Sequence, residues 1–154
     1  MIDEPRIAQL EATPTAVIPL RISRAEMPNV MGPAVQEVIA AVEEQGASPT
    51  GAVFAHHFRM DPEVFDFEVG MPVSKPVLPA GRVRPGERPP IRVVQTLYHG
   101  PYEGLPAAWG AFHRWIEEKK LKWAPDIWEV YVVHPDAEPN PANWRTELNR
   151  PLAL

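Results

Sequence analysis

FEVGMPV, the stretch Phe67–Val73, aligns without gaps on TELNRPL, the stretch Thr146–Leu152. Each copy follows a short strand-like run that ends in a turn with proline, Phe58–Pro62 in the first case and Tyr131–Pro135 in the second. Setting one turn on the other places His56 opposite Glu129. Because the order of elements also repeats, we interpret the chain as an internal duplication.

Two helical patterns recur in the same place in each half. Apolar residues follow three- and four-residue spacing in Val30–Gln45 and Glu103–Lys120, which predicts two amphipathic helices. Pro33 is expected in the first turn of the first helix, and Gly46 is expected to end it. Strands are predicted at Ile7–Ala12, Ala16–Ser23, Val53–Phe58, Phe65–Pro72, Arg82–Arg84, Ile91–His99, Ile127–Val133 and Trp144–Leu148.

These elements predict an α+β fold in a single domain over residues 1–154, with repeat halves at approximately 6–76 and 77–154. Neither strand–helix–strand unit buries much surface alone, so the two should be related by a pseudo-twofold axis and share one curved antiparallel sheet. Both helices are expected on one side of that sheet, and a central ligand groove is expected on the opposite side, where the halves meet.

The strand Ile127–Val133 carries an acid among apolar residues, IWEVYVV. Alternation along a strand puts Glu129 and Tyr131 on one face. We expect Phe54 and His56 from the first half to face the same groove, together with Phe58. A carboxylate in such a place either holds buried donors together or forms the floor of a ligand pocket, and residue identity leaves both open.

Composition restricts the possible functions. The 154 residues carry a formal net charge of −5 and no cysteine, which argues against a nucleic-acid-binding surface and excludes disulfides and thiolate metal sites. No signal peptide and no apolar run of membrane-spanning length is present, so a soluble, cytoplasmic protein is expected. There is no glycine-rich phosphate loop, and we expect no cofactor. His56 and His57 point to opposite faces of a strand, so we expect no metal site.

Four motifs in this order resemble the GyrI-like small-molecule-binding domain, also called the AraC-type effector-binding domain. They are FEVGMPV at Phe67–Val73, HGPYEGL at His99–Leu105, WEVY at Trp128–Tyr131 and TELNRPL at Thr146–Leu152. The resemblance extends from about Ala12 to Leu152 and implies two duplicated units around a ligand groove. Met1–Glu11 is too short for a DNA-binding segment, so a stand-alone member without direct nucleic acid binding is expected.

The resemblance implies that Glu129 pairs with cationic lipophilic ligands or activates water. The leading interpretation is a stand-alone protein that binds or sequesters lipophilic or aromatic cations of the multidrug type, with Glu129 as countercharge. Tyr131, Tyr102, Trp109, Phe54 and His56 would then line the groove. Phe112 is expected in the core.

Two alternatives remain beside the binding protein. In the first, the protein is a hydrolase that detoxifies strained electrophilic compounds of the cyclopropanoid type. Glu129 would then be the general base, and Tyr131 would protonate or stabilise the leaving oxygen. In the second, the protein interacts with gyrase. Residue types alone leave open whether the protein is an enzyme and which protein partner it has.

Overall fold

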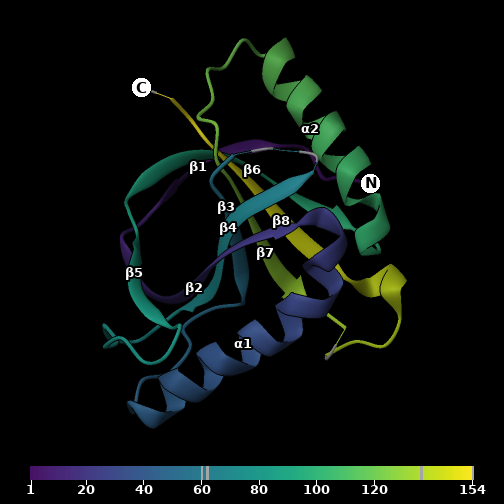
Figure 1. Ribbon diagram of the computed structural model, residues 1–154. Helices are drawn as coiled ribbons and strands as arrows, with labels where there is room; N and C mark the ends of the chain where they lie inside the picture. The colour runs from purple at the N-terminus through teal and green to yellow at the C-terminus, as the bar shows by residue number, and fades with distance from the viewer. Residues whose placement is uncertain (60, 62, 136, 154) are drawn as a thin grey trace.

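The computed structural model describes residues 1–59, 61, 63–135 and 137–153 of the 154-residue chain. Eight strands form one antiparallel sheet in the order β1-β6-β8-β7-β3-β4-β2-β5. The strands and the two long helices are β1 (Arg6–Leu10), β2 (Thr13–Ser23), α1 (Met27–Glu44), β3 (Phe54–His57), β4 (Val64–Pro72), β5 (Arg84–Arg88), β6 (Ile91–His99), α2 (Leu105–Glu118), β7 (Ile127–Val133) and β8 (Arg145–Pro151). Helices α1 and α2 lie on one side of this sheet (Figure 1), so the predicted fold class is confirmed.

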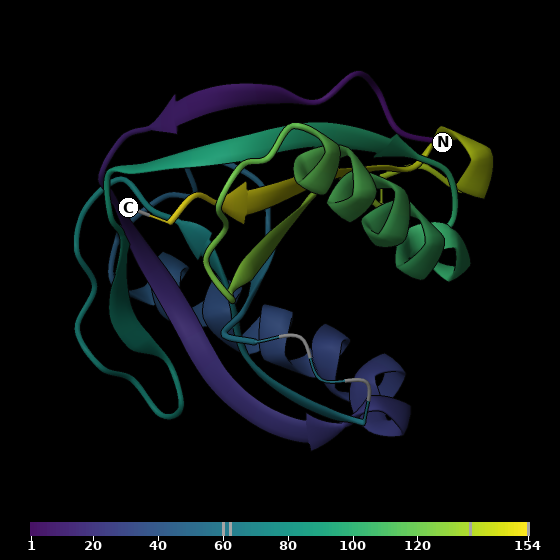
Figure 2. The same cartoon turned by 90° about the horizontal axis from the view of Figure 1, so that it is seen from above.

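The sheet order shows the twofold relationship between the halves. Strands β3 and β7 pair at the centre, followed outwards by β4 and β8, then by β2 and β6. The outermost strands are exchanged, because β1 of the first half pairs with β6 of the second, and β5 of the second half pairs with β2 of the first. The sheet curls strongly as a result, with β1 and β2 on opposite sides of the curl (Figure 2).

The strand register corrects the repeat alignment by one residue. Glu68 of β4 and Glu147 of β8 are equivalent, as the alignment of Phe67–Val73 on Thr146–Leu152 predicts, and both lie within their strands. Their neighbours on the central strands are His56 and Val130. His56 is therefore the counterpart of Val130, and Ala55 becomes the counterpart of Glu129. The turns used for the sequence alignment include Met60 and Pro62, which lie outside the described residues.

This one-residue difference matters because it moves every side chain to the other face of a strand. Within the central pair, Glu129 is directly opposite Ala55, whereas Phe54 is opposite Val130 and His56 is opposite Trp128. Exchange of the two halves maps the Ala55–Glu129 pair onto itself. The pseudo-twofold axis therefore passes through this pair.

The helix α1 begins at Met27, so Pro33 lies inside it and the prediction of a first-turn position was wrong. Pro28 occupies the first turn instead. Pro33 lacks a backbone N–H and is tolerated on the partly exposed stretch before the buried stripe. That stripe consists of Ala34, Val38, Ala41 and Val42, which pack on the sheet.

Both helices end in the same backbone motif. After α1, Ala47 N–H donates to the Val42 carbonyl and Gly46 N–H donates to that of Glu43, with a φ of 70° at Gly46. These are the two bonds of a Schellman motif, so the predicted stop at Gly46 is confirmed. After α2, Leu121 and Lys120 make the corresponding bonds to Ile116 and Glu117, with a φ of 56° at Lys120.

Other boundaries differ modestly from the prediction. Strands β6 and β7 have the predicted bounds, whereas the strand predicted at Arg82–Arg84 was misplaced and runs from Arg84 to Arg88. The last strand continues to Pro151 because it pairs on both sides, with β6 and with β7. In the described part of the chain, no helix is long and apolar enough to cross a membrane.

Candidate functional site

The carboxylate of Glu129 is enclosed between the sheet and helix α2. Its side chain extends from β7 on the helix side, so the expectation that it faces a groove on the side away from the helices was wrong. The residue is only 9% exposed. Trp109 of α2 donates its indole N–H to Oε2 over 2.7 Å, and the Tyr131 hydroxyl donates to Oε1 over 2.9 Å. The predicted proximity of Glu129, Tyr131 and Trp109 is therefore observed.

The position of Trp109 follows from the packing of its helix. Phe112 and Ile116 lie on the same stripe of α2 and are fully buried against β6 and β8, as predicted for Phe112. A helix turn before them, Trp109 reaches the axis of the sheet and meets Glu129. The anchoring of α2 thus determines which donor the carboxylate receives.

The loop before α2 positions Tyr102. Tyr98 lies beneath this loop and donates its hydroxyl to the Pro101 carbonyl over 2.8 Å. Gly104 passes so close to Tyr98 that a Cβ atom there would lie 2.0 Å from the hydroxyl oxygen, and Gly100 has a φ of 134°. Both positions therefore require glycine. The His-Gly-Pro-Tyr segment, His99–Tyr102, therefore has a fixed backbone conformation that leads into α2.

Aromatic rings extend the site from the carboxylate towards the surface. The Tyr102 ring lies 5.8 Å from that of Tyr131 and 5.0 Å from that of Trp144, between centroids. All three side chains are partly exposed. Trp144 was not predicted as a site residue. It was expected to be the first residue of the strand Trp144–Leu148, whereas it lies just before β8.

Burial dominates the electrostatics of this cluster. Desolvation raises the pKa of Glu129 despite the two hydrogen bonds that favour its ionised form. The pKa of Tyr131 is raised well above its ordinary value by burial and by the adjacent carboxylate. The site therefore favours a proton, or another cation, at Glu129.

Phe54 and His56 do not join this site, and the prediction that they share a face with Glu129 was wrong. Both extend from the opposite face of the sheet, where Phe54 packs 5.0 Å from Trp128 and His56 stacks on the same indole at 3.8 Å between ring centroids. Burial disfavours protonation of His56, but hydrogen bonds to Asp126 and Glu68 outweigh it and raise the pKa. The ion pairs with Asp126 and Glu68 also account for the partly buried position of the His56 ring.

The carboxylate has no counterpart in the first half. The Schellman positions Gly46 and Lys120 differ by 74 residues, and the same offset relates Ala55 to Glu129 and Val35 to Trp109. Both counterparts are apolar. Ala55 is buried in the hydrophobic core between α1 and the sheet, and Val35 packs against that core. The polar site is thus confined to the second half of a nearly symmetric frame.

A curled eight-stranded sheet that carries two helices on one face, duplicated about an axis beside an enclosed acid, defines a class of small-molecule-binding domains. The chain belongs to the GyrI-like family, because the model of the GyrI-like small molecule binding domain matches residues 3–153. No curated protein matches the sequence significantly.

Solved structures with the same fold include regulators and a hydrolase. The EcmrR C-terminal domain superimposes with a TM-score of 0.85 at 17% identity, covering 97% of both chains. EcmrR in its complex with DNA gives 0.86 at 18% identity, where this chain is 97% covered and spans 57% of the EcmrR chain. SAV2435 bound to tetraphenylphosphonium gives 0.71 at 10% identity, with 98% and 94% covered. A hydrolase from Listeria innocua gives 0.70 at 13% identity, with 97% and 92% covered. At these identities the similarity establishes the fold.

Proposed function

We propose that this protein binds lipophilic aromatic cations, with Glu129 as the countercharge. The observation that carries the proposal is the environment of that carboxylate, which is buried and has no cationic partner within 4 Å among the described residues. Its hydrogen-bond donors are the neutral side chains of Trp109 and Tyr131. Buried carboxylates are normally paired with a positive charge, so this site lacks the group that a cationic ligand would supply.

The neighbouring rings suit the same ligand. Tyr102, Tyr131 and Trp144 present aromatic surface next to the acid, and a cation held over such rings gains about 0.5–2 kcal/mol from each contact. Trp109 closes the site in the free protein, so the ligand would replace the indole at the carboxylate. The structure of SAV2435 with tetraphenylphosphonium supports this chemistry for the fold, since the ligand there is a lipophilic cation.

Calorimetric titration with tetraphenylphosphonium tests the proposal, with triphenylphosphine oxide as a neutral ligand of related shape. Glu129→Gln keeps the size of the side chain and one of its two acceptor oxygens, and it removes the charge. We expect at least tenfold weaker binding of the cation to this variant and no change for the neutral ligand. Glu118→Gln, an exposed change on α2, is the matched control. Equal affinity of wild type and Glu129→Gln for the cation would contradict the proposal.

A second candidate function is hydrolysis of a strained electrophile such as an epoxide or an activated cyclopropane. The hydrogen bond between Tyr131 and Glu129, at 2.9 Å, is the observation that favours it. Water would attack the strained carbon while Glu129 accepts the water proton, and Tyr131 would protonate the leaving atom as the ring bond breaks. Mass spectrometry of an epoxide incubated with wild type and Glu129→Gln separates the two functions. Hydrolysis predicts a diol product with wild type only, whereas an unchanged epoxide in a stoichiometric complex shows binding without turnover.

A further inference from the structure

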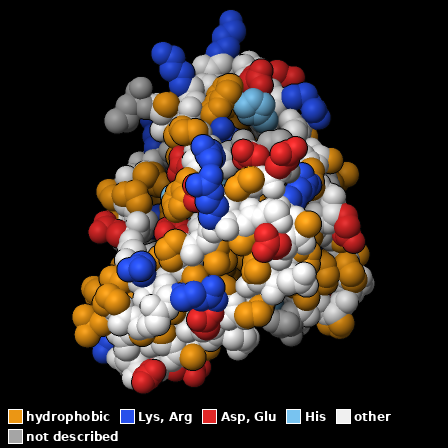
Figure 3. Space-filling model, viewed as in Figure 1, with side chains coloured by type: hydrophobic (Ala, Val, Ile, Leu, Met, Phe, Trp, Pro, Cys, Tyr) orange, Lys and Arg blue, Asp and Glu red, His pale blue; other side chains and the backbone are white. Residues whose placement is uncertain are grey.

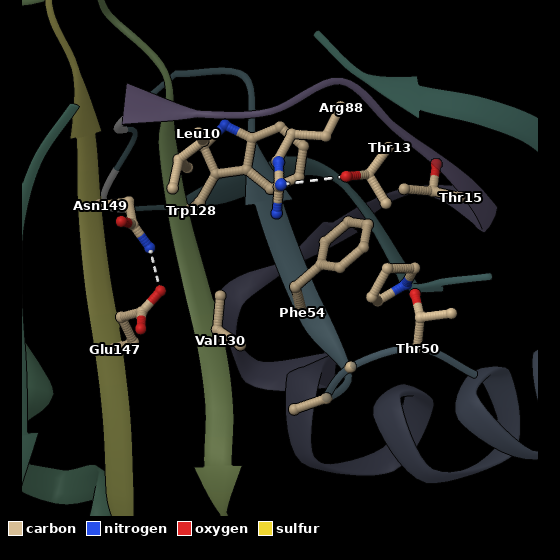
Figure 4. A pocket seen from close by; sticks show the side chains of 13 residues that line it. Leu10, Thr13, Thr15, Thr50, Phe54, Arg88, Trp128, Val130, Glu147 and Asn149 are labelled. Atoms are coloured by element: carbon tan, nitrogen blue, oxygen red, sulfur yellow. Dashed lines mark hydrogen bonds between the residues drawn. The ribbon is translucent and has the colours of Figure 1, made fainter. Parts of the chain in front are cut away.

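A cavity lies on the other face of the sheet, inside its curl. It has a volume of about 240 Å³ and is lined by strands from both ends of the sheet order as well as from its centre. The aromatic rings of Phe54 and Trp128 form one wall, with Val130 and Leu10 beside them (Figure 4). Glu129 points to the opposite face, so this cavity is separate from the site described above.

Two buried donors of this cavity have no acceptor. Among the described residues, Arg88 Nε and Trp128 Nε1 are fully shielded from solvent and lack a hydrogen-bond partner. Trp128 is only 5% exposed, so water does not readily satisfy its indole N–H. An unpaired buried donor is destabilising, and both of these donors belong to residues that line the same cavity.

The charged groups of the cavity are held in place but are not neutralised. The other arm of the Arg88 guanidinium donates to the Glu11 carbonyl at 2.9 Å and to Thr13 Oγ1 at 3.1 Å. Glu147 accepts from the Asn149 amide over 3.0 Å. Neither charge has an ion-pair partner within 4 Å in the described part of the chain.

A chain of side-chain hydrogen bonds holds Glu147 in position on its side of the cavity. Asn149 accepts from Gln95 at 2.8 Å, and Gln95 accepts from Arg6 at 2.9 Å. These bonds orient the Asn149 amide towards Glu147 (Figure 4). The cavity therefore presents a fixed cation, a fixed anion and an aromatic wall.

We propose that this cavity binds a small aromatic molecule carrying both a carboxylate and an amine, of the aromatic amino acid class. The carboxylate would pair with the Arg88 guanidinium, the amine would pair with Glu147, and the ring would pack on Phe54. A ligand with the acid alone would face Glu147 uncompensated, and one with the amine alone would face Arg88. The volume limits the ligand to one or two rings, because 240 Å³ is below the usual range of drug-sized pockets.

Three probes with the same ring system test the charge requirement: L-tryptophan, indole-3-propionate and tryptamine. Titration calorimetry and ligand-observed NMR on the full chain should show L-tryptophan binding at least tenfold tighter than either single-charge probe. Arg88→Gln should abolish the advantage over tryptamine, and Glu147→Gln should abolish the advantage over indole-3-propionate. Arg92→Gln and Glu118→Gln are exposed controls with the same charge changes and should leave all three affinities unchanged.

The two sites can be told apart in the same experiments. Glu129→Gln should not alter binding of L-tryptophan, and Arg88→Gln should not alter binding of tetraphenylphosphonium. Equal affinity for the three probes, absence of binding up to millimolar concentration, or L-tryptophan binding that survives both cavity variants would overturn the proposal. Circular dichroism of each variant confirms that a lost affinity is not a lost fold.

Discussion

Ala55 and Glu129 face each other across the central strand pair, and each is the symmetry counterpart of the other. A methyl group and a carboxylate thus occupy equivalent positions beside the same axis. The surrounding frame is otherwise similar in both halves, including the Schellman ends of the two helices. The difference in chemistry between the halves is concentrated at one pair of residues.

Glu129→Gln should make stability less dependent on pH. The folded state raises the pKa of Glu129, so the folded protein holds a proton that the unfolded chain releases above about pH 4.5. Stability contributed by this group is therefore present at low pH and is lost as pH rises from 4.5 through the folded pKa. We expect wild type to lose stability relative to the variant as pH rises towards 8, because ionisation of the buried carboxylate is unfavourable. Urea unfolding between pH 4 and pH 8 measures the difference, and a constant difference across this range would contradict the prediction.

Trp109→Phe should separate stability from affinity. The variant loses the indole donor to Glu129 and leaves one carboxylate oxygen unsatisfied, which should cost about 1–3 kcal/mol in urea unfolding. Cation binding should nevertheless become tighter, because the ligand no longer has to replace the indole. Trp115→Phe on the same helix is the control and should not tighten binding. Weaker cation binding to Trp109→Phe would mean that the indole is part of the ligand contact surface.

His57 should reduce stability in mild acid. It packs against Phe67 at 4.9 Å between ring centroids, and burial, reinforced by the nearby His56, lowers its pKa to about 4. Its ordinary value is 6.5, so the unfolded chain takes up a proton first as pH falls, and stability is lost between pH 6.5 and about 4. The full effect is on the order of 3 kcal/mol. Subtracting the unfolding free energies of His57→Leu from those of wild type at each pH isolates this contribution, and a flat difference curve would refute it.

Lys120→Gly should stabilise the protein. Lys120 has a φ of 56°, a conformation that costs a non-glycine residue about 1–2 kcal/mol, whereas the equivalent Gly46 adopts it freely. The greater freedom of glycine in the unfolded chain offsets part of the gain. A rise of about 1 kcal/mol in the free energy of unfolding is expected. Gly46→Ala is the reciprocal variant and should be destabilised, while a loss of stability in Lys120→Gly would show that the lysine makes compensating contacts.

The sequence predicted the architecture well because duplication and periodicity are properties of long segments. Strands Ile91–His99 and Ile127–Val133 have the predicted bounds, and both helices lie where their apolar stripes indicate. Glu129, Tyr131 and Trp109 come together because two belong to one strand face and the third to the helix that packs on it. Tyr102 joins them through the glycine-dependent loop.

Register was harder to predict than element order. The alignment that placed His56 opposite Glu129 is wrong by a single residue, and that difference moved Phe54 and His56 to the opposite face. Strand pairing depends on contacts between distant segments, which a turn motif such as Tyr131–Pro135 does not specify. The cavity beside Arg88 was missed for the same reason, since its lining comes from strands at both ends of the sheet order.

The exposed surface offers a weaker basis for ligand selectivity than the two enclosed sites proposed above. On the face drawn in Figure 3, acidic and basic side chains are interspersed with apolar ones. With charges of both signs mixed in this way, the face offers no extended field of one sign to a charged partner. Selectivity for small ligands would therefore reside in the enclosed groups.

The exchange of β1 and β5 between the halves connects symmetry to the chemistry at the axis. Two identical single-unit chains that assembled in this way would place the same residue twice at the Ala55–Glu129 position. A glutamate there would face its own copy, and like charges opposite each other destabilise a strand pair. Joining the two units in one chain removes that constraint, because each position can then change independently. A solitary buried acid is thus available to a fused duplicate and is disfavoured in a symmetric homodimer.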